Sequence, residues 1–128
     1  MTEEPSAQAK FAQTRHQLYR TFIETYTDGE AKPHYLQLIN DAVKTKRYFV
    51  PINMQTVYRL IPNLYHDTIK YIDEMIPVIG DCVCQIAIEE NPKEDPDEID
   101  NNMKVWIIVP FFKRSFPVKL SLILDNAH

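Results

Sequence analysis

The chain has 128 residues, of which 45% are hydrophobic and 25% charged, and its formal net charge is −4 at pH 7. This length is typical of one domain that buries about two-thirds of the surface exposed by its unfolded state. No run of about 18 apolar residues is present, and the polar start lacks the pattern of a signal peptide. We therefore expect a soluble intracellular protein with no membrane association.

Negative charge is concentrated in residues 89–101, which hold seven acidic side chains and one lysine and therefore carry a net charge of −6. The rest of the chain contains 13 of the 14 basic residues and 11 of the 18 acidic ones, so its net charge is about +2. This small positive charge neither requires nor excludes a nucleic-acid partner. We interpret the acidic segment as a disordered connector, with a docking site for a basic partner as the alternative.

The first two predicted elements are helices. Ser6 is a plausible N-cap for the first helix, and Asp28-Gly29 follows its end. The second helix extends from Pro33 to Lys46. The apolar side chains expected on their buried faces are Phe11, Leu18, Tyr19, Phe22, Ile23 and Tyr26 in the first, and Tyr35, Leu36, Ile39, Ala42 and Val43 in the second.

A short strand is predicted at Tyr48–Ile52. Pro51 cannot donate a ladder hydrogen bond, so we expect an edge or isolated strand that joins helices rather than builds a sheet. Asn53 is expected to cap a third helix that stops at Pro62. The inward side chains of this helix would be Val57, Leu60 and Ile61.

The stretch Leu64–Glu89 is the expected organising element. Pro77 and Gly80 weaken a helix, and Cys84 to Ile88 alternate as in a strand, but the longer helical spacing favours helix. We expect two helices here, the second beginning around Asp73. The apolar stripe consists of Ile69, Ile72, Ile76, Ile79, Val83 and Ile86.

The C-terminal part predicts two strands, Met103–Phe112 and Pro117–Leu124, joined by the turn Lys113–Phe116. The fold class is therefore mainly α with a small β part: a four-helix bundle-like subdomain followed by a β-hairpin. The expected division is a helical subdomain at 1–88, an acidic linker at 89–102 and the hairpin at 103–128, which is also the potential start of an incomplete oligonucleotide-binding barrel.

The sequence predicts no catalytic, cofactor-binding or metal-binding residue. Cys82 and Cys84 are too close for an ordinary disulfide and do not form a CxxC motif, so we expect free buried thiols. The only glycines, Gly29 and Gly80, cannot build a phosphate loop. The neighbouring pairs His66-Asp67 and Asp73-Glu74 are interpreted as a solvated helix face and as first-turn acids, because adjacent helical residues point in different directions. A small enzyme would need a pocket at His66 or Cys84.

The candidate DNA contacts are Lys113 and Arg114, beside Phe111, Phe112 and Phe116. Basic and aromatic side chains together hold phosphates and stack bases, although such aromatics more often pack on a core. A second basic group, at the end of the second helix, consists of Lys44, Lys46 and Arg47.

Four segments in this order resemble the amino-terminal helical subdomain of a minichromosome maintenance (MCM) replicative helicase subunit. They are YRTFIETY (19–26), HYLQLINDA (34–42), RYFVPIN (47–53) and NLYHDTIKYIDEMIPVIGDCV (63–83). In the last of these segments, the residues that match the family's sequence pattern are Leu64, Tyr71, Glu74, Ile76, Pro77 and Val83. The opening Asn-Leu-Tyr of this segment is similar to that of subunit four. Asp97-Glu98-Ile99 and Val109-Pro110-Phe111 resemble the family's acidic linker and first barrel strand.

Three features depart from the family: Ile72 replaces a frequent Pro, Val109 replaces an Arg, and nothing after Phe112 follows the pattern. The resemblance implies a fragment or truncated form that acts as a non-catalytic assembly and regulatory domain, without the family's ATPase or zinc site. It also implies a nuclear location and other helicase subunits as partners in a hetero-oligomeric, hexameric ring. The alternative is a standalone α+β protein-interaction module unrelated to replication.

Overall fold

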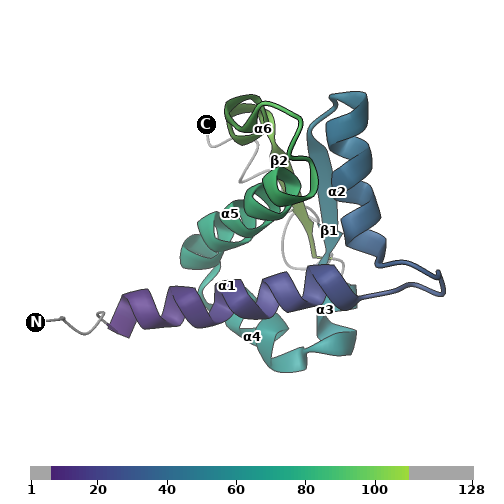
Figure 1. Ribbon diagram of the computed structural model, residues 1–128. Helices are drawn as coiled ribbons and strands as arrows, with labels where there is room; N and C mark the ends of the chain where they lie inside the picture. Colours follow the sequence, from purple (N-terminus) through teal and green to yellow (C-terminus); the bar gives the residue numbers. More distant parts are fainter. Residues whose placement is uncertain (1–6, 110–128) are drawn as a thin grey trace, which may run out of the picture.

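The computed structural model describes residues 7–109, with side chains described from Lys10 onward. These residues are mainly helical and include one small sheet, which confirms the predicted fold class (Figure 1). The elements are α1 (Ala7–Thr25), α2 (His34–Thr45), β1 (Phe49–Asn53), α3 (Met54–Leu60), α4 (Pro62–Lys70), α5 (Ile72–Glu90), α6 (Pro96–Asn102) and β2 (Lys104–Ile108).

Helix α5 lies at the centre of the fold and contacts α1, α2, α4, α6 and β2. The organising role expected for Leu64–Glu89 is therefore confirmed, and Cys84 to Ile88 are helical. The predicted stripe is right only in part, because Ile69, Ile72 and Ile76 are half-buried. The fully or almost fully buried side chains of α5 are Met75, Ile79, Cys82, Val83, Ile86 and Ala87.

The break between α4 and α5 falls at Tyr71, whose backbone angles (φ −121°, ψ 46°) leave the helical region. Its ring lies 5.1 Å from that of Phe11 in a T-shaped contact, so α1 covers this corner. Helix α5 begins one residue before the predicted start, and Pro77 lies inside it. The prediction of two helices is confirmed.

An aromatic cluster joins α1 to α2. The ring of Phe22 lies 5.3 Å from that of Tyr26 and 5.4 Å from that of Tyr35, so the two predicted apolar faces meet. Helix α1 ends at Thr25, and Gly29 follows in the connection with φ 76°. The C-cap of α2, Lys46, is also left-handed (φ 59°), a conformation that glycine adopts more readily.

The two strands form a parallel pair in which Phe49 lies opposite Lys104 and Ile52 opposite Ile107. The expectation that the first strand builds no sheet is therefore wrong. A parallel pair needs a long crossover, here α3 to α6, so its partner is not visible in local sequence. Among the described residues, β1 has β2 as its one neighbour, so Pro51 lies on an edge strand, as expected. Pro51 costs no ladder hydrogen bond, because the residues on either side of it make the bonds to β2.

Two other local predictions have different outcomes. The side chain of Asn53 accepts a hydrogen bond from the backbone N–H of Gln55, which confirms the predicted cap of α3. Leu60 was expected to face inward but is 48% exposed, because α3 is short and ends at this residue.

The interpretation of the acidic segment as disordered is wrong for residues 96–102, which form α6. Asp95 caps this helix by accepting a bond from the N–H of Asp97, and Ile99 is fully buried. The predicted cap Ser6 and the predicted strand Pro117–Leu124 lie outside the described residues.

Candidate functional site

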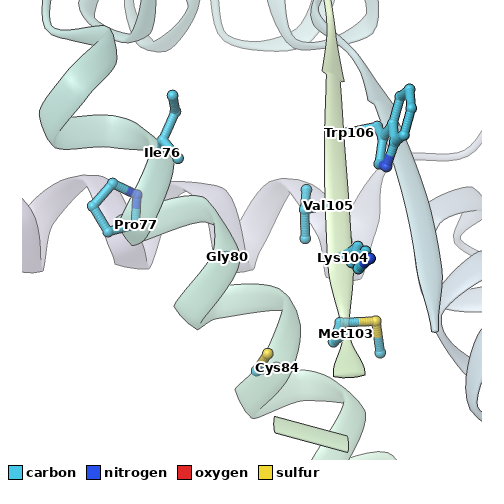
Figure 2. Close-up of a pocket in the computed structure, with 8 residues that line it drawn as sticks. All are labelled: Ile76, Pro77, Gly80, Cys84, Met103, Lys104, Val105 and Trp106. Carbon is cyan, nitrogen blue, oxygen red and sulfur yellow. The ribbon is translucent and has the colours of Figure 1, made fainter. Parts of the chain in front are cut away.

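A groove of about 330 Å³ runs between α5 and β2. Figure 2 shows Val105 on the side of β2 that faces α5 and Trp106 on the other side. The remaining lining residues are Ile76, Pro77, Gly80, Cys84, Met103 and Lys104. Among the lining residues that the structure describes, Lys104 alone carries a full charge, so this part of the groove is suited to apolar side chains.

Gly80 makes the groove deeper on the α5 side. A Cβ atom built at this position meets no heavy atom within 4 Å, so the space beside the helix is open. On the opposite face of the sheet, the ring of Phe49 lies 5.2 Å from that of Trp106 in a T-shaped contact. Trp106 and Ile108 on this outer face are therefore half-buried, whereas Val105 and Ile107 on the other face of β2 are buried.

The two cysteines are free, as predicted; Cys82 is buried and Cys84 is half-buried. Burial raises the pKa of the Cys84 thiol to about 11, and the carboxylates of Asp100 and Asp81 add to this effect. Burial likewise raises the pKa of Cys82 to about 12. Both thiols are therefore protonated at neutral pH and are poor nucleophiles.

The side chains of His66 and Asp67 have different partners. The carboxylate of Asp67 accepts a hydrogen bond from Arg15 at 2.6 Å, which joins α1 to α4. The ring of His66 lies 5.9 Å from that of Tyr58. Asp73 and Glu74 lie in the first turn of α5, as predicted, where carboxylates interact favourably with the helix dipole.

Sequence reasoning missed the contacts that bind the acidic segment to the rest of the fold. Glu89 accepts two hydrogen bonds from the guanidinium of Arg20, one of them at 3.0 Å. Lys46 lies 3.4 Å from Glu94 and 3.6 Å from Glu98, and the Tyr48 hydroxyl donates to Glu98 at 2.9 Å. The sequence did contain one signal for these contacts, namely many acidic residues in one segment and basic residues elsewhere with no predicted partner. This signal did not identify which residues form the pairs.

The candidate DNA contacts Lys113 and Arg114 lie outside the described residues, as do Phe111, Phe112 and Phe116. Lys44, Lys46 and Arg47 are exposed at the end of α2. Because Lys46 is paired with two glutamates, the positive potential at this end is reduced.

Within residues 7–109, no three His, Cys, Asp or Glu side chains converge closely enough to hold a metal ion. None of the helices described is both long and apolar enough to cross a membrane. The described residues thus define a small α+β domain. Its candidate functional site is the apolar groove between α5 and β2.

The profile of the MCM N-terminal domain family matches residues 16–108, from the middle of α1 to the last residue of β2. Because this match covers more than half of the sequence, the chain belongs to the MCM N-terminal domain family. A comparison with curated proteins found no match.

Proposed function

We propose that this chain is a non-catalytic assembly and regulatory domain of an MCM replicative helicase subunit. The observation that carries the proposal is the family match over residues 16–108, which includes α2 to α6 and both strands. The match also counts against the alternative of a module unrelated to replication, since that alternative treated the resemblance as coincidence.

The proposed partners are other helicase subunits in a hetero-oligomeric hexameric ring, in the nucleus. Subunit four is the proposed relative, on the basis of the segment Asn63-Leu64-Tyr65. In this segment, Leu64 is fully buried and Tyr65 nearly so, which supports a structural role for those two side chains. DNA contact through Lys113 and Arg114 is the proposed secondary interaction, and ATP hydrolysis belongs to residues that this sequence does not contain.

Large apolar side chains on the surface support a role in protein contacts. Leu60 is 48% exposed, and Phe49 and Tyr58 are each 42% exposed. Aromatic and aliphatic side chains of this kind act as anchors when an interface buries them. The surface of α3, which carries Leu60, is the proposed contact.

Size-exclusion chromatography of the purified chain with the other helicase subunits tests the assembly proposal. We expect co-elution, and we expect Leu60→Asp to weaken it at least tenfold without lowering the melting temperature. Thr21→Asp places the same charge on the exposed face of α1 and serves as the matched control. A chain that elutes alone at every concentration would contradict the assembly role, whereas equal effects of both variants would contradict only the α3 contact.

A further inference from the structure

A second groove, of about 680 Å³, lies between α1 and α5. These two helices pack against each other (Figure 1), and the lining residues of the groove belong to them. The lining positions on α5 are 74, 77, 78, 81 and 85, which recur at intervals of three and four. Residues at these intervals share one face of a helix, so the groove follows α5 for about three turns.

Two carboxylates line this groove without a lysine or arginine among the described lining residues. Glu74 and Asp81 are both exposed, and a separation of seven residues places them on one face of α5, about 10 Å apart along its axis. Within residues 7–109, the side chain of Glu74 has no ion pair or hydrogen bond. The negative charge is therefore not balanced locally, and we call this space the acidic groove.

The arginines of α1 do not balance this charge, because they have other partners. Arg15 pairs with Asp67 of α4, and Arg20 pairs with Glu89 at the end of α5. Both partners lie outside the lining of the acidic groove. A cation at Glu74 and Asp81 would therefore have to come from another molecule.

The contact between His16 and Asp81 leaves hydrogen-bonding groups unused. The Nε2 atom of His16 is 3.1 Å from the Asp81 carboxylate, yet this atom is buried and makes no hydrogen bond. The Gln85 amide donates to Asp81 at 3.4 Å, which is long for a hydrogen bond. A buried polar atom without a partner is rare in folded proteins, and Asp81 lacks a close donor. Both observations favour a ligand that brings hydrogen-bond donors.

Pro77 adds a backbone acceptor and an apolar surface to the same face. Because proline has no N–H, it cannot donate the helical hydrogen bond to the carbonyl of Asp73. This carbonyl lies one turn before Pro77 on the same side of α5. The small apolar side chains of the groove are those of Pro77, Val78 and Ala12. The acidic groove thus has an apolar centre between two carboxylates.

We propose that the acidic groove binds a basic α-helix of a partner protein. The partner helix carries arginine or lysine at positions i and i+7, with small apolar side chains at i+3 and i+4. Its two cations then have the spacing of Glu74 and Asp81, since every α-helix rises about 1.5 Å per residue. Arginine and lysine supply donors and no acceptor, which suits the carboxylates and the Asp73 carbonyl.

Charge and sequence distinguish this partner from two other occupants. A second copy of this chain does not supply the pattern, because no two of its 14 Lys and Arg residues are seven positions apart. Nucleic acid is disfavoured, because the carboxylates repel phosphates. The acidic groove lies on α1 and α5, whereas the proposed subunit contact lies on α3, so the two surfaces can be tested separately.

Fluorescence anisotropy with a labelled peptide and the full chain tests the spacing. The probe is an alanine-rich peptide of about 18 residues, long enough to form a helix by itself, with arginines at i and i+7. The control peptide has the same composition but arginines at i and i+5, which point about 140° apart. We expect saturable binding of the probe, and binding of the control peptide weaker by about tenfold or more. Absence of saturable binding, or equal binding of both peptides, would overturn the proposal.

Variants of the chain test whether the two carboxylates hold the probe. We expect Glu74→Gln, Asp81→Asn to weaken binding by about tenfold or more at an unchanged melting temperature, because it removes both charged acceptors. The matched control Asp28→Asn, Asp41→Asn removes two exposed carboxylates elsewhere and should leave the affinity within about twofold. Equal losses in the two double variants would mean a general attraction of charge and would overturn the groove as the site.

NMR of the histidine rings tests where the probe binds. His16 lines the acidic groove, whereas His66 is exposed on α4. We expect the ring signals of His16 to shift as the probe is added and those of His66 to stay in place. A shift at His66 without one at His16 would place the peptide on another surface and overturn the proposal.

Discussion

At the scale of single residues, a buried hydroxyl pair joins α1 to α4. The hydroxyl oxygens of Tyr19 and Thr68 lie 2.6 Å apart, and both residues are fully buried. Because the Thr68 hydroxyl donates to the carbonyl of Leu64 at 2.8 Å, Tyr19 is the donor to Thr68. Burial raises the pKa of Tyr19 well above its usual value, which keeps this donor protonated.

We expect Tyr19→Phe to lower the free energy of unfolding by about 1 kcal/mol, since it removes one buried hydrogen bond and little volume. Thr68→Val should cost a similar amount, and the double variant should cost less than the sum of the two. Urea unfolding of all four proteins measures this coupling. Strict additivity would show that the two hydroxyls do not interact.

Adjacent residues of α5 differ in burial, and substitutions should reflect this difference. From sequence alone, Ile76→Asp is expected to unfold the helical part, but Ile76 is only half-buried beside the groove. Met75 is fully buried. We therefore expect Met75→Asp to cost about 3–5 kcal/mol, as an unpaired buried charge does, and Ile76→Asp to cost clearly less. Thermal melting followed by circular dichroism measures the order, and a larger loss for Ile76→Asp would contradict it.

At the scale of elements, the two glycines differ in backbone conformation: one lies inside a helix and the other has a positive φ. Gly80 lies inside α5 with open space beside it, whereas Gly29 has φ 76° in the connection between α1 and α2. Glycine weakens a helix interior through its conformational freedom but is favoured at positive φ. The same substitution should therefore have opposite signs at the two positions.

We expect Gly80→Ala to raise the free energy of unfolding by about 0.5–1 kcal/mol, because alanine is the better helix former and its Cβ meets no neighbour. Gly29→Ala is the matched comparison and should lower it by about 1 kcal/mol, because a Cβ is strained at positive φ. Chemical denaturation measures both. Destabilisation by Gly80→Ala would indicate that the space beside α5 is filled.

At the scale of the whole molecule, pairs of opposite charge connect segments that are distant in sequence. Arg15 joins α1 to α4, Arg20 joins α1 to the end of α5, and Lys46 joins α2 to the acidic segment. These side chains are partly exposed, so each pair is worth less than a buried one. The pairs made by Arg20 and Lys46 hold the acidic segment against the rest of the fold, and the pair made by Arg15 holds α4 against α1.

The pair between Arg20 and Glu89 predicts a dependence of stability on acid. The hydrogen bond from Arg20 lowers the pKa of the Glu89 carboxyl below its usual value of 4.5. A carboxyl with a lowered pKa stabilises the fold above the unfolded-state pKa, and this contribution is lost as the pH falls through the folded-state pKa. We expect the melting temperature of Arg20→Gln to fall less steeply than that of the unaltered chain between about pH 6 and about pH 3. Lys93→Gln removes an exposed base from the same segment and is the control. A fall as steep in Arg20→Gln as in the unaltered chain would show that the pair is not responsible.

The sequence by itself determined helices α1 to α5 and the family, but not α6. Apolar spacing located the faces of α1 and α2, Asn53 located the start of α3, and Pro62 located its end. These signals are readable because helical periodicity and caps involve residues within about one turn of each other. The residues from Leu64 to Val83 that pack the centre also carry the family resemblance.

Only the tertiary structure decided which distant segments meet. The pairing of Phe49 with Lys104, the contacts of the acidic segment with Arg20 and Lys46, and the half-burial of Ile76 depend on elements brought together by folding. The groove has the same origin, because Gly80 and Val105 belong to separate elements. Local sequence specifies which face of an element is apolar, but the packing of all elements together decides what that face meets.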